Sequence, residues 1–88
     1  MKCIRAHYSG KVQGVGFRWN AVQCSEGLNL SGYVKNLPDG RVELVVQGKE
    51  SGVITFLNLI ESSMKGYIHN VKKAEETEGK YGPFAVRR

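Results

Sequence analysis

The sequence has no apolar run that could cross a membrane and no N-terminal stretch of the kind that directs secretion. No apolar segment approaches the roughly 18 residues that a membrane-spanning helix requires. Lys2, Arg5 and His7 interrupt the N-terminus before an apolar segment can form. We therefore expect a single cytoplasmic domain over residues 1–88 with no membrane partner, since this length suffices for one core.

Cysteine is scarce, and the residue types that build metal and covalent sites do not gather in the sequence. Cys3 and Cys24 are the only cysteines, and they form neither a CxxC pair nor a dense framework. Reduced thiols are the simpler interpretation, although the sequence leaves a bridge between them open. No His, Cys, Asp and Glu group has metal-ligand spacing, and no Ser-His-Asp relay, Cys-His relay or carboxylate pair can be assembled. We expect no cofactor and no metal.

The sequence also lacks a concentrated block of positive charge. Basic residues outnumber acidic ones by 13 to 8, and the formal net charge of +5 favours anionic partners. The basic residues are dispersed, however, and only Lys72-Lys73 and Arg87-Arg88 are adjacent pairs. No block has the length typical of a nucleic-acid-binding tail. Charge alone does not choose between nucleic acid, a membrane surface and a phosphorylated metabolite.

Hydrophobic periodicity predicts a mixture of strands and helices. Ile4, Ala6 and Tyr8 alternate with polar residues, which is typical of a half-buried strand. Two later segments carry apolar residues at helical spacing. Asn29 stands where the first helix should end, because asparagine tolerates the left-handed conformation of such an end. The predicted strands are 2–9, 30–37, 41–47, 67–76 and 84–87, and the predicted helices are 17–28 and 53–64.

This order of elements predicts an α+β fold of the ferredoxin-like βαββαβ type. Its sheet would be predominantly antiparallel, with two helices on one face and a short extra C-terminal strand. The strand–helix–strand crossover makes strands 2–9 and 30–37 parallel, and the Pro38-Asp39-Gly40 turn starts an antiparallel strand. Because parallel strands end at the same edge of a sheet, residues 10–18 and Asn36 are expected to meet there.

The most informative segment joins the first strand to the first helix and reads GKVQGVGFR from Gly10 to Arg18. A glycine-rich turn at a helix N-terminus lets backbone N–H groups converge on an anion, and a guanidinium suits phosphate oxygens. The alternative is that the glycines only turn a strand into a helix. Neither common nucleotide-binding signature fits this spacing, but the segment is more elaborate than a turn requires. Arg18 also opposes the helix dipole unless an anion is bound, so we favour a phosphate site.

Asn36 is the second candidate site residue. Taken alone, an asparagine before Leu-Pro-Asp-Gly is better explained as a residue that shapes the turn. Only its expected position beside the glycine-rich segment makes it a site candidate. Two other polar residues have simpler interpretations: we expect His7 on the solvent face of the first strand and Asp39 in the turn. Glu75, Glu76 and Glu78 are interpreted as a solvated acidic patch.

A phosphate site without an evident acid, base or metal suits only an easy phosphoryl transfer. The mixed anhydride of a carboxylic acid and phosphate is such a substrate, because the leaving carboxylate has a conjugate-acid pKa of about 4 and needs no proton donor. The protein then has to hold the phosphoryl group, offset its charge and direct a water in line. An alkyl phosphate ester would require more catalytic groups.

These residues closely resemble the motifs of the acylphosphatase family. The segment from Gly10 to Arg18 resembles the family signature G-x-V-Q-G-V-x-F-R, and Gly32-Tyr33-Val34-Lys35-Asn36, with Asp39-Gly40-Arg41-Val42 and Gly48 after it, resembles the second motif. The resemblance covers essentially the whole chain and weakens after Met64. Ala21, Asn29 and Tyr33 depart from the family pattern, in which threonine, glycine and tryptophan are frequent, and none of these departures touches Arg18 or Asn36.

The resemblance implies metal-independent hydrolysis of acyl phosphates on a five-stranded ferredoxin-like sandwich. In this sequence Arg18 would bind the phosphate, and the N–H groups of Gln13, Gly14, Val15, Gly16 and Phe17 would complete the cradle. Asn36 would orient the attacking water, and a phosphate oxygen of the substrate could take up the proton of that water. The partner would be a small acyl phosphate, with phosphate as product or inhibitor, and the protein is expected to be a monomer.

The sequence leaves two other functions open. RNA-recognition modules share this strand order, but they need aromatic residues on the central strands for base stacking, and residues 42–47 contain none. We therefore expect no nucleic-acid partner. The second alternative is a domain of a larger protein that handles carbamoyl phosphate. The chain starts with Met1 and ends in Arg87-Arg88 without a linker, which favours a free-standing domain.

Overall fold

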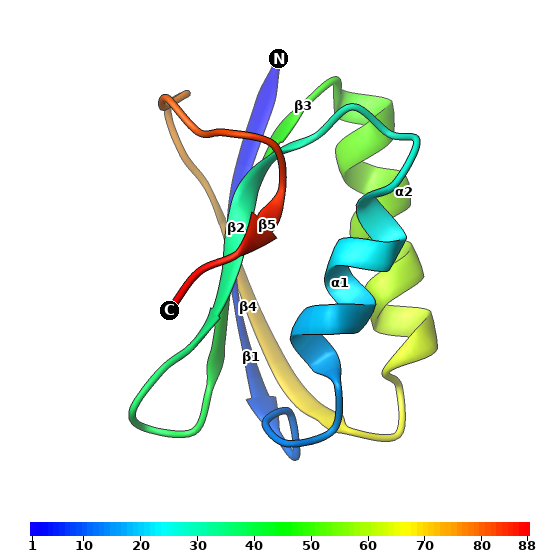
Figure 1. Ribbon diagram of the computed structural model, residues 1–88, viewed down its shortest axis with the longest axis vertical. Helices are drawn as coiled ribbons and strands as arrows, with labels where there is room; N and C mark the ends of the chain where they lie inside the picture. The colour runs from blue at the N-terminus through cyan, green and yellow to red at the C-terminus, as the bar shows by residue number, and fades with distance from the viewer.

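The computed structural model describes residues 1–88 as one mixed sheet with two helices packed on a single face (Figure 1). The elements follow one another as β1 (Lys2–Gly10), α1 (Phe17–Ser25), β2 (Ser31–Asn36), β3 (Val42–Gly48), α2 (Glu50–Ser63), β4 (Ile68–Glu75) and β5 (Ala85–Val86). The sheet order is β4-β1-β3-β2-β5. This arrangement confirms the predicted ferredoxin-like fold. None of the helices has the length and apolar character that crossing a membrane demands.

The strand pairing places the ends of β1 and β2 at one edge of the sheet. β3 lies between them and pairs antiparallel with both, so that Ala6 and Val34 each face Leu44. β1 and β2 therefore run parallel to each other, as the crossover predicted. The segment after β1 and the hairpin after β2 emerge together at the lower end of the molecule (Figure 1).

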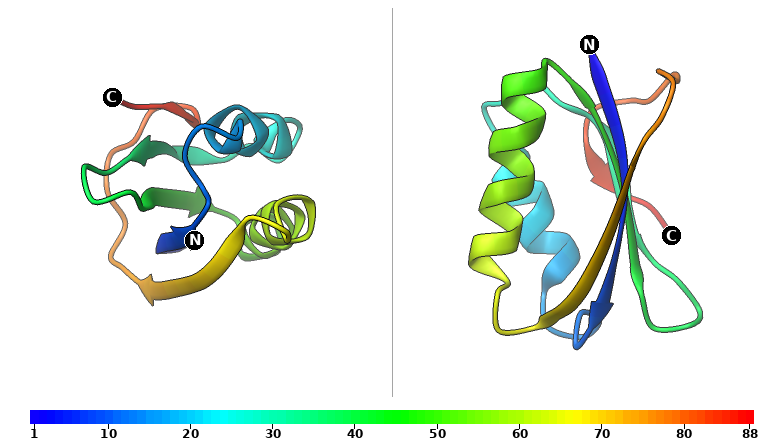
Figure 2. Two further views of the ribbon diagram at one scale, coloured as in Figure 1. Left: turned by 90° about the horizontal axis from the view of Figure 1, so that it is seen from below. Right: turned by 180° about the vertical axis from the view of Figure 1, so that it is seen from behind.

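The main core fills the space between the helices and one face of the sheet. Each of its residues has more than nine-tenths of its surface buried, and the strands that contribute to it are β1, β2 and β3. The buried residues include Ala6, Tyr8, Ala21, Val34, Leu44, Phe56 and Ile60. The other face carries no helix (Figure 2, right). A small second cluster of Cys3, Tyr33 and Val45 is buried there, with Tyr81 packed against it. Cys3 and Cys24 form no disulfide bond.

The structure corrects the predicted ends of the helices. Helix 17–28 was predicted too long, since α1 ends at Ser25. Gly27 adopts φ of 80°, a conformation that a right-handed helix cannot include, so the chain turns before the predicted end. Asn29 does adopt the left-handed conformation with φ of 56°, but in the connection to β2. α2 begins at Glu50, earlier than the apolar stripe from Val53 indicated.

Candidate active site

The segment between β1 and α1 forms a loop with unpaired backbone donors. Gly14 and Gly16 have φ of 77° and 79°, which side-chain-bearing residues rarely adopt. Gly16 is the N-cap of α1 and supplies no capping side chain, and the first turn contains no acidic residue. The N–H groups of residues 13–17 donate to no carbonyl or side chain. An anion is the partner that such donors and the positive end of a helix favour.

Gln13 attaches this loop to the β2–β3 hairpin. Its Nε2 donates to the carbonyl oxygens of Leu37, at 2.8 Å, and Arg41, at 3.0 Å. The backbone N–H of Lys11 anchors the start of the loop by donating to the carbonyl of Tyr67 at 2.9 Å. The view from behind shows the loop and the hairpin at the same end of the molecule (Figure 2, right). The glycine loop is thereby fixed relative to the end of β2.

A cavity of about 370 Å³ opens between the loop, α1 and the ends of β2 and β5. Ten residues line it: Val12, Gly14, Gly16, Phe17, Arg18, Trp19, Val22, Asn36, Val86 and Arg88. None of them is an aspartate, glutamate, histidine or cysteine. The cavity therefore combines cationic, amide and backbone donors with an apolar wall, and offers no side chain that titrates near neutral pH.

Arg18 projects into this cavity from the first turn of α1. Its side chain is half-buried and forms no ion pair or hydrogen bond with the protein. A guanidinium in this position has all of its donors free for an anion. Its proximity to the helix N-terminus is unfavourable in the absence of a negative ligand, because both carry positive charge. The loop and Arg18 therefore favour the same kind of ligand.

Asn36, the last residue of β2, contributes the amide of the cavity. Its Oδ1 is buried and has no hydrogen-bond partner, the only buried side-chain oxygen or nitrogen in this state. Leaving a buried acceptor unsatisfied costs about 1–3 kcal/mol, so such atoms usually face a water or a ligand. The turn itself does not use this side chain, because Asp39 supplies the turn contact by accepting from the backbone N–H of Arg41 at 3.0 Å.

The structure brings most of the predicted site residues together. Gly14, Gly16, Phe17, Arg18 and Asn36 line the cavity, whereas Gln13 and Val15 do not. The Gln13 side chain instead donates to the hairpin, and the Val15 side chain packs against the core.

Sequence reasoning missed the apolar wall of Trp19, Val22 and Val86 and the guanidinium of Arg88. The spacing from Arg18 to Val22 could have indicated a shared helix face, but nothing local places β5 beside β2.

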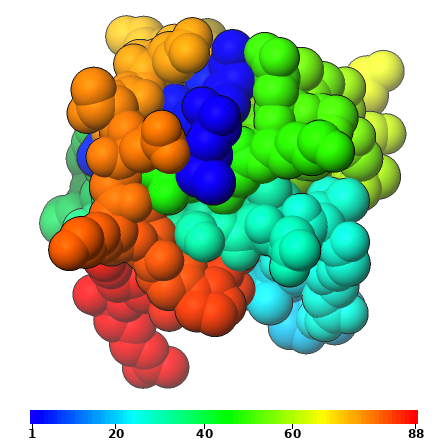
Figure 3. Space-filling view, turned by 90° about the horizontal axis from the view of Figure 1, so that it is seen from above, coloured from blue at the N-terminus to red at the C-terminus, as the bar shows by residue number.

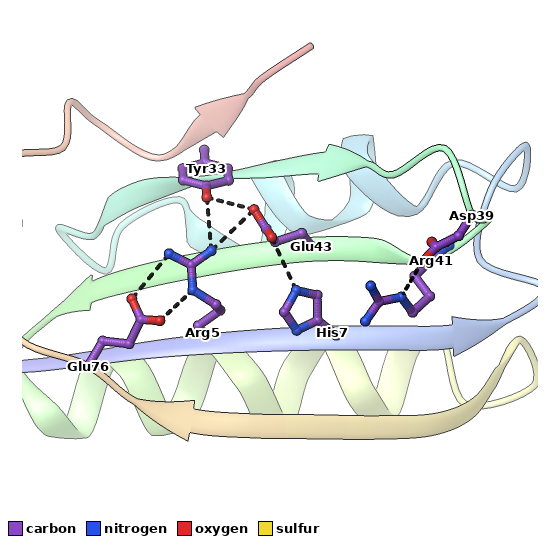
Figure 4. Close-up of polar contacts among 7 residues, drawn as sticks. All are labelled: Arg5, His7, Tyr33, Asp39, Arg41, Glu43 and Glu76. Carbon is purple, nitrogen blue, oxygen red and sulfur yellow. Dashed lines mark hydrogen bonds and ion pairs between the residues drawn. The ribbon is translucent and has the colours of Figure 1, made fainter.

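The open face of the sheet carries a second polar cluster, shown in Figure 4. Arg5 pairs with Glu76 through Nε and through Nη2, the latter at 3.2 Å from Oε1. Tyr33 donates its hydroxyl to Glu43 Oε1 at 2.7 Å and accepts from Arg5 Nη1 at 3.3 Å. His7 Nε2 lies 3.1 Å from Glu43 Oε2. We name these residues the open-face network: Arg5, His7, Tyr33, Glu43 and Glu76.

The open-face network shifts the pKa values of its members, and its contacts correct one prediction. Burial would raise the pKa of Glu43, but hydrogen bonds from Tyr33 and His7 and the charge of Arg5 outweigh it and hold this pKa below its ordinary value. The pKa of Arg5 is raised, chiefly by its hydrogen bond to Glu76. The interpretation of Glu76 as part of a solvated patch was therefore wrong, because Arg5 reaches it across the sheet.

The far end of the molecule contains no comparable arrangement. Figure 3 looks onto that end, where the N-terminus, the start of α2 and the segment around residues 75–83 gather. There Lys2 pairs with Glu50 at 3.1 Å and Glu75 at 3.5 Å, so its charge is compensated within the protein. The one buried side-chain acceptor without a partner, Asn36 Oδ1, lies instead at the glycine-loop end.

Known proteins share this sequence and this fold. The family model described as Acylphosphatase matches residues 4–86. An acylphosphatase from Methanospirillum hungatei is 39% identical over 90 residues, which cover 100% of this chain and 99% of that protein. The crystal structure of acylphosphatase from Bacillus subtilis superposes with a TM-score of 0.89 at 26% identity, with complete coverage of both chains. HypF of T. kodakarensis matches 100% of this chain with only 12% of its own length, at a TM-score of 0.83 and 33% identity.

Proposed function

The chain belongs to the acylphosphatase family, whose members are hydrolases acting on acid anhydrides, and we propose that the cavity beside α1 is where it cleaves acyl phosphates. The observation that carries this proposal is that Arg18 and Asn36 line the same cavity. Neither side chain has a partner in the protein. The products would be a carboxylate and inorganic phosphate.

The phosphoryl group would be held at the polar end of the cavity. The guanidinium of Arg18 can bind two phosphate oxygens at once, and the free N–H groups of residues 13–17 can complete the cradle. Both sets of donors would offset the negative charge of the transition state without rearrangement. Gln13 supports this cradle from outside by keeping the loop attached to the hairpin.

Asn36 would hold the attacking water. Its buried Oδ1 lacks a donor, and a water O–H would satisfy it. The water oxygen would form a bond to phosphorus as the bond from phosphorus to the acyl oxygen breaks, with the electron pair leaving on the carboxylate. No acid or base side chain lines the cavity, so the proton of the water would pass to a phosphate oxygen of the substrate. The residues require no metal in this scheme, since Arg18 and the backbone supply the positive charge.

The proposal is tested by phosphate release from acetyl phosphate with EDTA present. We expect turnover that EDTA leaves unchanged, no comparable turnover of an alkyl phosphate ester, and competitive inhibition by inorganic phosphate. Asn36→Ala should lower kcat by about 10²-fold, because the water loses its fixed position. Asn70→Ala is the matched control, since Asn70 is exposed on β4. Full activity of Asn36→Ala, or turnover that needs a divalent cation, would contradict the proposed mechanism.

We also propose that the protein is located in the cytoplasm. The unpaired thiols of Cys3 and Cys24 support a reducing compartment such as the cytoplasm. The monomeric state and the lack of a nucleic-acid partner stay predictions. On the central strands β1 and β3, the open-face network places charged side chains where an RNA-recognition module would need aromatic ones.

A further inference from the structure

The cavity has an apolar wall that phosphate binding does not use. Trp19 and Val86 are among the few large apolar side chains left exposed, at 68% and 44% of their surface. Both line the cavity together with Val22. Exposed apolar groups that border a polar pocket commonly mark the apolar part of a ligand site.

Two elements place this wall next to the phosphate end. Along α1, Val22 follows Arg18 by four residues and Trp19 by three, so these side chains lie on one side of the helix. Across the sheet, β5 runs parallel to β2, with Val86 beside Val34. Asn36 follows Val34 by two residues and therefore faces the same side of the sheet as Val34. Trp19 and Val86 thus approach the cavity from its two sides, α1 and β5.

We propose that Trp19, Val22 and Val86 form an acyl subsite that selects apolar acyl groups larger than acetyl. This inference rests on the proposed function, because the acyl group is defined only when the phosphoryl group sits against Arg18. The cavity of about 370 Å³ falls within the ~300–1,000 Å³ of typical small-molecule sites, and a phosphoryl group alone would fill a small part of it. Part of the remaining space is bordered by the apolar side chains of Trp19, Val22 and Val86, which favour methylene groups over water.

Arg88 also lines the cavity and could instead select an acyl group that carries a second anionic group. Its side chain is exposed and has no partner within the protein. An exposed charge is screened by water and salt, whereas the contact with Trp19, Val22 and Val86 removes apolar surface from water. We therefore assign selection to the apolar wall and treat selection by Arg88 as an outcome that would overturn this assignment.

The test compares kcat/KM for acetyl phosphate and butyryl phosphate. These substrates differ by two methylene groups and have leaving carboxylates of similar basicity. We expect the wild type to favour butyryl phosphate by up to about 15-fold, since each buried methylene contributes up to roughly fourfold. Trp19→Ala should bring this ratio close to one, and Trp19→Phe should retain most of it. Leu59→Ala is the matched control, because Leu59 is an exposed apolar residue of α2 outside the cavity.

Fluorescence gives a readout that is independent of turnover. Trp19 is the only tryptophan of the chain, so its emission reports on this wall alone. Butylphosphonate, which cannot be hydrolysed, should shift the emission to shorter wavelength, and inorganic phosphate should shift it less. An equal response to both ligands would contradict contact between Trp19 and the butyl group.

The outcomes separate this inference from the function on which it rests. If neither acetyl phosphate nor butyryl phosphate is hydrolysed, the proposed function fails and the acyl subsite fails with it. If both substrates are hydrolysed with equal kcat/KM, only the acyl subsite is overturned. It is likewise overturned if Arg88→Ala abolishes the preference while Trp19→Ala keeps it, or if Leu59→Ala lowers the ratio as much as Trp19→Ala does.

Discussion

The polar side chains of the open-face network have partners within the protein, whereas those of the cavity beside α1 have none. Arg5, Tyr33, Glu43 and Glu76 bind one another, and each charge finds an opposite charge or a hydroxyl within the network. Arg18 has no partner in the protein, and the buried Oδ1 of Asn36 has none either. Arg5 in the network forms ion pairs with Glu43 and Glu76, whereas Arg18 in the cavity forms none.

The presence or absence of partners within the protein distinguishes a structural cluster of polar residues from a functional one. Mutually satisfied groups offset their own desolvation, and they stabilise a surface that no helix covers. Groups left unpaired carry a cost that the fold tolerates only where a ligand or water removes it. The same residue type is therefore expected to affect stability in the open-face network and activity in the cavity. Variants of the two regions should therefore differ in whether they lose stability or activity.

The largest effect is expected for Arg18→Ala. Loss of the charge-assisted donors should lower kcat/KM for acetyl phosphate by roughly 10²–10³-fold, as removal of a transition-state donor does elsewhere. Folding stability should stay within about 0.5 kcal/mol, because Arg18 contacts no protein group that would be left unpaired. Urea unfolding supplies the stability. Phosphate should raise the Tm of the wild type and leave that of the variant unchanged.

The opposite result is expected for Arg5→Ala. Removing this guanidinium leaves Glu76 and the partly buried Glu43 without their cation, so the free energy of unfolding should fall by about 1–3 kcal/mol. The kcat of the remaining folded enzyme should match that of the wild type. Arg41→Ala is the control, since the side chain of Arg41 pairs only with exposed Asp39 within its own turn. A large loss of kcat in folded Arg5→Ala would show that the two regions are coupled.

Gln13→Ala should lower both the folding stability and kcat, each by a moderate amount. The change removes two hydrogen bonds between the loop and the hairpin, and we expect a loss of about 1–2 kcal/mol in stability. We also expect a moderate loss of kcat, because the loop and Asn36 would no longer be held in fixed relative positions. Both values come from one preparation by urea unfolding and phosphate release. Unchanged kcat in a destabilised variant would mean that the contact serves folding alone.

The smallest effect concerns acid pH and Glu43. Its pKa is held below the ordinary value of 4.5 in the folded protein, so its carboxylate stabilises the fold above that value. This contribution is lost as the pH falls from about 4.5 through the lower pKa of the folded state. Glu43→Gln should therefore be less stable than the wild type at pH 7, and the gap in Tm should narrow at pH 3. A gap that stays constant with pH would show that the charge of Glu43 does not matter.

Much of the fold and half of the site could be predicted because their signals are local. Alternating Ile4, Ala6 and Tyr8 and the helical stripe from Val53 each reflect which side of one element faces the core. The crossover rule then brought the glycine loop and Asn36 to one edge without any knowledge of side-chain packing. The end of α1 was missed because the apolar pattern continues to Leu28, while the backbone already turns at Gly27.

By itself, the sequence determined the order of elements, the glycine loop with Arg18 after it, and the edge at which Asn36 ends its strand. These follow from periodicity, turn chemistry and chirality, which act between residues close together in the chain or through general rules of connection. Only the tertiary structure decided that Arg5 pairs with Glu76, that Gln13 holds the hairpin, and that Val86 borders the cavity. Such contacts join residues far apart in sequence, and strand register and packing, rather than local preference, choose between the possible partners.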